Sequence, residues 1–153
     1  MNAKKLLSEI KDSLSIKRVF GEPIERGHVT VVPVAAVVVG AGTLRTERYT
    51  PIAVDDAQRG PRAAQGLPAA LPIIAVSNSG EVPPRLDGIR DGSVVLATHR
   101  SAPGLKQSAG SLGDDNVIVC GADAVDLGAL VQALHERGWT RLLAEGGPSL
   151  LSA

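Results

Sequence analysis

The most regular pattern in the chain is a series of short, almost continuously hydrophobic runs separated by polar and glycine-rich segments. Four runs share this pattern, and they occupy residues 71–77, 93–98, 116–121 and 141–147. Runs that are hydrophobic at successive rather than alternating positions are typical of strands covered on both faces. An earlier run from Val29 to Val39 is mostly small and β-branched. We expect it to break at Pro33, because proline cannot donate to a central ladder.

Two segments have the spacing of amphipathic helices. Residues 3–14 carry aliphatic side chains on one face, which predicts a helix there. A second aliphatic stripe follows Asp126, a suitable N-cap, and ends before Gly138, a suitable stop. It consists of Leu127, Leu130, Val131 and Leu134. Because this stripe lies between two hydrophobic runs, the strand–helix–strand order predicts a right-handed parallel crossover.

The segments between the other runs predict loops. Residues 55–71 are rich in Gly, Pro, Ala and Arg, and we interpret them as a surface loop or a frayed short helix. Residues 99–115 are interpreted as a second loop. The whole pattern predicts an α/β fold with a mostly parallel central sheet flanked by helices.

Composition excludes several classes of function. Lys plus Arg and Asp plus Glu both number 16, so the net charge is zero and no broad basic field exists to hold nucleic acid or an anionic membrane. One Phe, one Tyr and one Trp are too few to build a base-stacking surface. One cysteine and three scattered histidines offer neither an internal disulfide nor a zinc-binding spacing, so we expect no metal. The charged N-terminus has the pattern of neither a signal peptide nor a membrane span, and we therefore expect a cytoplasmic protein.

Two glycine turns at strand ends are candidate ligand sites. In the first, "VVVGAGT", Gly40 and Gly42 let a ligand approach the backbone, and Thr43 is suited to cap the following helix while its amides face an anion. A single such turn is more often structural, and "GAG" lacks the full spacing of the dinucleotide fingerprint. Two turns at the carboxyl edge of one parallel sheet would suit a dinucleotide, or a nucleotide with a phosphorylated substrate.

The second turn lies in "LLAEGGPSLLSA". Gly146 and Gly147 form the turn, Pro148 suits a first helical position, and Ser149 can donate to a phosphate. Glu145 stands at the strand end before them. A carboxylate there is poorly placed for packing and well placed to accept hydrogen bonds from ligand hydroxyls. The alternative interpretation is a simple solvated strand end.

Four segments together carry a resemblance to a known family. They are "AVVVGAGTLRTERY", "PIIAVSNSGEVPP", "VVLATH" and "LVQALHERGWTRLLAEGGPSLL". From about residue 37 to residue 153 the chain resembles the C-terminal reductase domain of the bifunctional riboflavin biosynthesis protein, in the dihydrofolate-reductase-like superfamily. The resemblance implies NADPH as cofactor. It also implies hydride transfer to the ribosyl C1′ of 5-amino-6-(5-phosphoribosylamino)uracil, a small phosphorylated substrate.

The same resemblance implies roles for single residues. Thr43 and Glu47 fall where the family contacts cofactor or substrate, Ser77 matches a serine that meets NADPH, and Glu145 matches a substrate-contacting acid. The residues expected to bind the cofactor are Gly40, Gly42, Thr43, Glu47, Ser77, Gly146, Gly147, Pro148, Ser149, Leu150 and Leu151. No catalytic residue is assigned, because His99 and Cys120 follow hydrophobic runs without a partner nearby in sequence.

The two ends of the chain differ from the reductase pattern. Residues 1–36 resemble the start of the YtfJ-type (GerW) sporulation proteins, in which a short helix leads to "GEP" and a strand. We therefore expect an N-terminal segment over 1–36 and a partial reductase domain over 37–153, with a sheet incomplete at both ends. An incomplete sheet exposes edge strands, and a homodimer would cover them. Two alternatives to the riboflavin-pathway reductase stay open: a non-enzymatic spore-associated or interaction protein, and a pterin-type reductase of the same superfamily.

Overall fold

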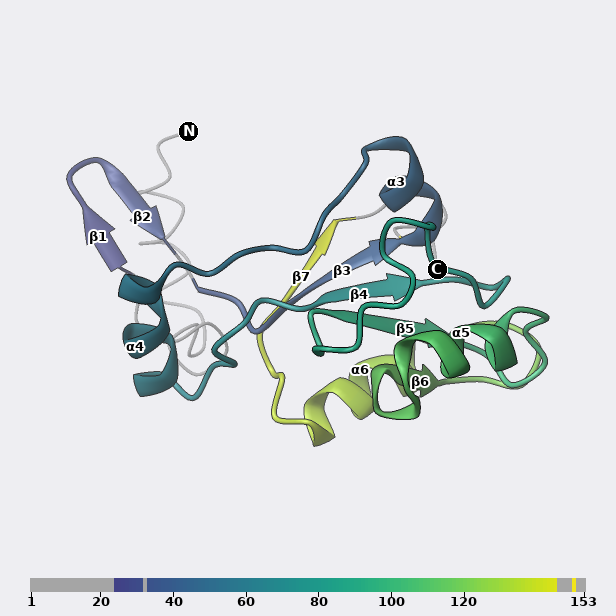
Figure 1. Cartoon of the computed structure of the whole chain (residues 1–153). Helices are drawn as coiled ribbons and strands as arrows, with labels where there is room; N and C mark the ends of the chain where they lie inside the picture. Colours follow the sequence, from purple (N-terminus) through teal and green to yellow (C-terminus); the bar gives the residue numbers. More distant parts are fainter. Residues whose placement is uncertain (1–23, 32, 146–149, 151–153) are drawn as a thin grey trace.

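The computed structural model describes residues 24–31, 33–145 and 150 (Figure 1). Within these residues, none of the helices has the length and apolar character needed to cross a membrane. The helix predicted over residues 3–14 lies outside the described residues.

A five-stranded parallel sheet forms the centre of the fold. Its strand order is β6-β5-β4-β3-β7, and all four neighbouring pairs are parallel. The strands are β3 (Ala36–Gly40), β4 (Ile73–Val76), β5 (Val94–Thr98), β6 (Val117–Val119) and β7 (Leu142–Glu145). Each of the four later hydrophobic runs thus contains one strand, and the predicted parallel α/β fold is confirmed.

A small antiparallel hairpin precedes the sheet. It pairs β1 (Ile24–Arg26) with β2 (Val29–Val31) across a turn at Gly27, whose φ is +61°. The early hydrophobic run is therefore divided between the hairpin and β3, and Pro33 belongs to neither strand. The predicted break is confirmed.

Helices cover both faces of the sheet because alternate residues of each central strand point to opposite sides. On one face, Val37 and Val39 of β3 pack in a cluster with Leu44 of α3 (Ala41–Thr46) and Leu112 of α5 (Leu105–Leu112). On the other face, β3, β4 and β5 pack against α6 (Leu127–Glu136) through residues that include Ala36, Val38, Ile74, Val95, Leu130 and Leu134. Figure 1 shows α3 at the arrowheads of the strands and α4 (Asp56–Ala64) at their opposite ends.

The helix predicted after Asp126 is confirmed. The Asp126 carboxylate accepts the amide of Ala129 at 3.0 Å, and the helix ends before Gly138, whose φ is +79°. Residues 55–71 contain α4, which Asp55 caps by accepting the amide of Ala57 at 2.7 Å. Of the two interpretations of that segment, the short helix is the one observed.

The prediction of a loop over residues 99–115 is wrong. That segment contains α5 and a single 3₁₀ turn at Asp114–Asn116. Its glycines and serines weaken local helix preference, but tertiary contacts compensate. Leu112 is fully buried in the core, and the hydroxyl of Ser108 donates to the carbonyl of Gly80 at 2.7 Å.

Candidate functional site at the carboxyl edge of the sheet

Three of the predicted positions meet where the central strands end. Gly40 ends β3 and pairs with Val76 of β4, which Ser77 follows directly. On the other side of β3, Glu145 of β7 pairs with Val39. The first glycine turn, the serine and the acid therefore lie on neighbouring strands at one edge, where open parallel sheets usually bind ligands.

The first glycine turn leads straight into α3. Gly40 is the N-cap residue, so the prediction that Thr43 caps this helix is wrong. Thr43 lies inside α3, and its carbonyl accepts the amide of Glu47 at 2.9 Å. A β-carbon built on Gly40 or on Gly42 would meet no atom within 4 Å. Packing among the described residues therefore does not require glycine at either position.

Glu145 has a protein partner that the sequence did not predict. The hydroxyl of Tyr49 donates to Oε2 of Glu145, although the two residues are 96 positions apart. This hydrogen bond to a carboxylate raises the pKa of Tyr49, and burial and the charges of Glu145 and Glu47 add to the effect. Nε of Arg85 donates to the carbonyl of Tyr49 at 2.7 Å, and the same guanidinium also donates to the carbonyl of Leu44.

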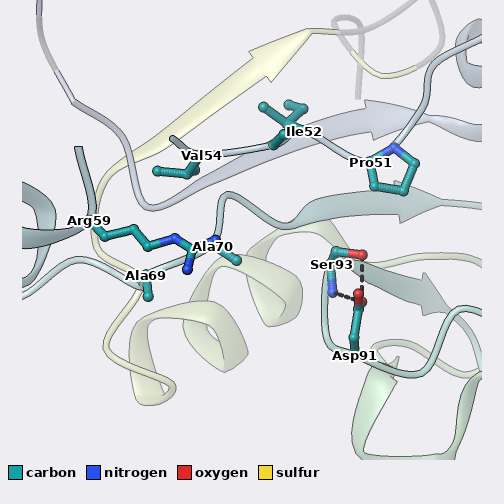
Figure 2. A pocket seen from close by; sticks show the side chains of 9 residues that line it. Pro51, Ile52, Val54, Arg59, Ala69, Ala70, Asp91 and Ser93 are labelled. Carbon is teal, nitrogen blue, oxygen red and sulfur yellow. Dashed lines mark hydrogen bonds between the residues drawn. The ribbon is translucent and has the colours of Figure 1, made fainter. Parts of the chain in front are cut away.

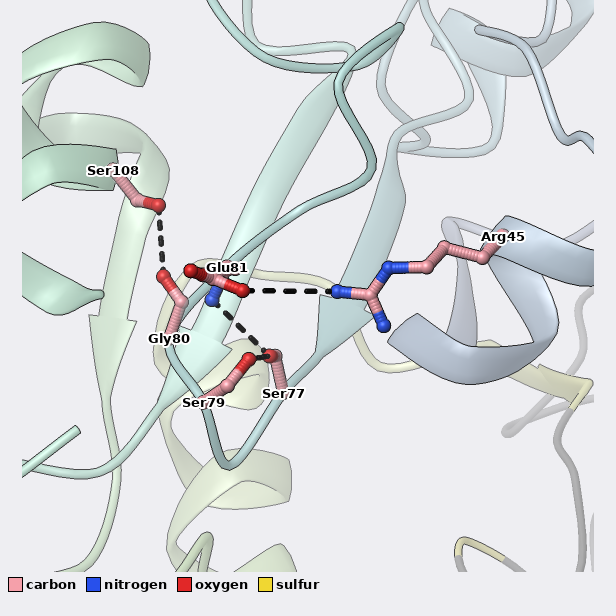
Figure 3. A network of polar contacts seen from close by, with 6 residues as sticks. All are labelled: Arg45, Ser77, Ser79, Gly80, Glu81 and Ser108. Atoms are coloured by element: carbon pink, nitrogen blue, oxygen red, sulfur yellow. Dashed lines mark hydrogen bonds and ion pairs between the residues drawn. The ribbon is translucent and has the colours of Figure 1, made fainter. Parts of the chain in front are cut away.

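Ser77 begins a tightly bonded loop after β4, which Figure 3 shows from close by. Its side chain is almost completely buried, and Oγ lies 3.1 Å from Oγ of Ser79 and accepts the amide of Glu81 at 3.2 Å. Gly80 has φ +74°, and a β-carbon there would lie 2.7 Å from the amide nitrogen of Leu105. The loop is therefore fixed against the start of α5.

A cavity opens between this loop and α3. Its volume is about 270 Å³, and Arg45, Glu81, Asp87, Gln107 and Ser108 contribute to its lining. Nη2 of Arg45 lies 4.0 Å from Oε2 of Glu81, and both side chains are about half exposed or more. This ion pair crosses from α3 to the loop, as the dashed line in Figure 3 marks.

His99 and Cys120 link the strand ends to one another. Nε2 of His99 donates to the carbonyl of Asn78 at 2.8 Å, and Nδ1 lies 3.1 Å from Oγ of Ser101. The thiol of Cys120 donates to the carbonyl of Thr98 at 3.5 Å, and burial raises its pKa. Both side chains are buried, and these contacts account for them as parts of the scaffold.

The second glycine turn is mostly outside the described residues. This applies to Gly146, Gly147, Pro148, Ser149 and Leu151, so their assignment to the cofactor stays a prediction. Leu150 is described, and it packs half-buried against the core cluster on the α6 face. Among the described residues, no group of three or more His, Cys, Asp or Glu side chains could hold a metal ion.

A second cavity, of about 310 Å³, lies at the amino-terminal ends of β4 and β5. Figure 2 shows Ile52, Val54 and Arg59 among its lining residues, with Asp91 and Ser93 at one side. The Asp91 carboxylate accepts from the amide of Ser93 at 2.9 Å and from its hydroxyl, which lowers the pKa of Asp91. This cavity is at the opposite edge of the sheet from Glu145 and contains none of the predicted site residues.

These features define the class of protein. A five-stranded parallel sheet, helices on both faces, and a glycine turn beside an acid at the carboxyl edge are those of a dihydrofolate-reductase-like α/β protein. The fold is shared with a pyrimidine reductase-like protein from Corynebacterium diphtheriae, with a TM-score of 0.61 and 26% sequence identity. The alignment covers 76% of this chain and 51% of that one, so this chain spans about half the length of its structural neighbour.

The sequence identifies the family within that class. Residues 28–153 match the RibD C-terminal domain, and the chain belongs to this family, a reductase family of riboflavin biosynthesis. The resemblance found in the sequence is thus confirmed. No curated protein matches the chain. The family match begins inside the segment likened to sporulation proteins, and the boundary after residue 36 stays a prediction.

Proposed function

We propose that this chain is an NADPH-dependent reductase domain acting on 5-amino-6-(5-phosphoribosylamino)uracil. The observation that carries the proposal is the position of Glu145 beside the glycine turn of β3 and the Ser77 loop, within a chain of the RibD C-terminal domain family. The neighbouring pyrimidine reductase-like protein supports the same class of chemistry.

The described residues fit a nicotinamide dinucleotide at this edge. Gly40 and Gly42 leave open space at the start of α3, where a β-carbon would otherwise stand. Backbone amides at the first turn of a helix attract anions, and no side chain of the described residues caps those of α3. We assign Thr43, Glu47 and Ser77 to the same ligand, together with Gly146 to Leu151.

The cofactor supplies a hydride when it is bound. The residues of the chain contribute positioning and electrostatics, which is the protein's usual share in such a reaction. Glu145 accepts hydrogen bonds from hydroxyls of the ribosyl chain and orients C1′ in its open-chain or imine form. The carbon gains the hydride and the attached heteroatom gains a proton, which water can supply because Glu145 is exposed to solvent.

Among the described residues, one side of β7 has no neighbouring strand, and this side suits association with a second copy. β7 is an outer strand of the sheet, and Leu143 on it is 43% exposed. Unpaired strand edges favour pairing with another chain, so we propose a homodimer that covers this edge. No contact among the described residues favours the spore-associated or the pterin-type alternative.

Cofactor binding tests the proposal without requiring turnover. At a cofactor concentration 100 times Kd, binding stabilises the folded state by about 2.7 kcal/mol. For a chain of this size we expect the melting temperature to rise by roughly 5–10 °C with NADPH, measured by thermal shift. NADH in parallel tests the preference for the phosphorylated cofactor.

A pair of variants localises this effect. Gly42→Asp places a carboxylate at the open start of α3 and should abolish the thermal shift with NADPH. Gly110→Asp puts the same group at an exposed position of α5, where a β-carbon also meets nothing within 4 Å. This control variant should retain the thermal shift with NADPH. No shift of the unaltered chain at millimolar NADPH or NADH would contradict the proposed function.

A further inference from the structure

The chain turns sharply after α3 and thereby directs Tyr49 toward β7. The helix ends at Thr46, and Arg48 has φ +54°, the one positive φ of a non-glycine residue in the part of the chain that the structure describes. A left-handed residue just after a helix reverses the chain direction, and it is energetically unfavourable for arginine. Strain of this kind persists only where the surrounding structure maintains it.

Arg85 holds the backbone on both sides of this turn. Its guanidinium donates to the carbonyl of Leu44 inside α3 and, at 2.7 Å, to the carbonyl of Tyr49 beyond the turn. Leu44 is fully buried, so the exposed Arg85 is anchored on a residue of the core. The ring of Tyr49 packs half-buried against the same core cluster. The phenol is therefore held in place before any ligand binds.

The acceptor of this phenol is the acid assigned to the substrate. Glu145 has two carboxylate oxygens, and the Tyr49 hydroxyl donates to Oε2. We propose that Tyr49 is a positioning residue for the reductase, which fixes Oε2 of Glu145 and leaves Oε1 oriented toward a hydroxyl of the substrate's ribosyl chain. This inference rests on the proposed function. A carboxylate fixed in advance loses less conformational entropy when the substrate binds.

The charged groups around the phenol keep it a donor. Glu145 and Glu47 both disfavour the phenolate, and they raise the pKa of Tyr49 together with its burial. The guanidinium of Arg85, which is nearby, donates to two backbone carbonyls. Because the folded pKa is raised, the stability from this contact is present below the ordinary pKa of tyrosine and is lost as the pH rises through the raised value.

The contact can be measured without substrate or cofactor. Tyr49 is the single tyrosine of the chain, so the ultraviolet absorbance of phenolate reports this residue alone. We expect its titration midpoint to lie above that of free tyrosine and to fall toward it in Glu145→Ala. Glu136→Ala, which removes an exposed carboxylate of α6, should leave the midpoint unchanged. A midpoint that does not respond to Glu145→Ala would overturn the contact, and with it the proposal.

The positioning role is tested by Tyr49→Phe. This variant keeps the ring and the backbone carbonyl but loses the hydroxyl. A hydrogen bond to a charged group corresponds to roughly a tenfold effect, so we expect KM for the pyrimidine substrate to rise about tenfold. The change in kcat, and in KM for NADPH, should stay below about twofold. In a Glu145→Ala background the same substitution should change kcat/KM by less than about twofold, because its partner is already absent.

Different results would contradict the proposed function and the positioning role of Tyr49. No turnover by the unaltered chain would contradict the proposed function and any role of Tyr49 in it, and the absorbance titration would then still decide whether the contact exists. Turnover that Tyr49→Phe leaves unchanged, or an equal effect of this variant with and without Glu145, would contradict the positioning role alone.

Discussion

Replacing Gly121 with alanine is expected to lower the free energy of unfolding by about 3–5 kcal/mol. Gly121 has φ +102°, a region that residues with a β-carbon rarely adopt. A β-carbon there would lie 2.0 Å from the carbonyl oxygen of Ala124 and 3.1 Å from the amide nitrogen of Asp126. Both are backbone atoms, so the clash cannot be relieved by rotating a side chain.

The Gly121 substitution would also disturb the carboxyl edge of the sheet, where the candidate site lies. The carbonyl of Gly121 accepts the amide of Arg100, and that of Ala122 accepts the amide of Ser101, both at 3.0 Å. These bonds tie the ends of β5 and β6 together beside His99. For a chain of this size, we expect the melting temperature to fall by roughly 6–20 °C.

Gly110→Ala is the matched control for this prediction. Gly110 lies in α5 with ordinary backbone angles and open space around its α-carbon. Alanine should stabilise such a helix by up to about 1 kcal/mol. Equal melting temperatures of the Gly121 and Gly110 variants would show that the turn after β6 does not need glycine.

Replacing Glu145 with alanine should have the largest effect on activity. Hydrogen bonds to a charged group contribute about 1.5–3 kcal/mol each, so losing the carboxylate should lower kcat/KM roughly 100-fold. The fold should tolerate the change, because Glu145 is an exposed residue at the end of β7. The thermal shift with NADPH should persist, since the acid is assigned to the substrate.

Glu136→Ala provides the comparison for this loss. Glu136 is also an exposed acid at the end of its element, and it accepts a hydrogen bond from Gln132 at 3.1 Å on α6. Removing the Glu136 carboxylate should leave kcat/KM within about twofold of the value of the unaltered chain. If both variants retained full activity, Glu145 would have no part in substrate binding.

The strands were predictable because their pattern is local. Each continuous aliphatic run between polar segments contains a strand, β3, β4, β5, β6 or β7. The predicted burial on both faces holds for β3, β4 and β5, but it is wrong for the outer strands β6 and β7, which are partly exposed. The helix α5 was not predictable in this way. Ser108 and Leu112 are buried there by contacts with the Gly80 loop and the sheet, which the segment's own sequence does not encode.

The candidate site also has a part that could be predicted from the sequence and a part that could not. Carboxyl ends of parallel strands meet at one edge, and this rule predicted that the Gly40 turn and Glu145 lie close together. Ser77 was predicted only from the family resemblance. The bond between Tyr49 and Glu145 depends on the turn at Arg48 and on the register of β7 against β3. Neither the turn nor the register is visible in a local pattern, so no sequence motif predicts the bond between Tyr49 and Glu145.

Transfer of deuterium from the cofactor to the substrate tests the proposed reduction itself. The chain is mixed with 5-amino-6-(5-phosphoribosylamino)uracil and with NADPH that carries deuterium at the transferable position of the nicotinamide C4, and the product is analysed by mass spectrometry and NMR. We expect oxidation of the cofactor and a ribitylamino product with deuterium at C1′. Cofactor that binds but is not oxidised in the presence of this substrate, or a product without deuterium at C1′, would contradict it.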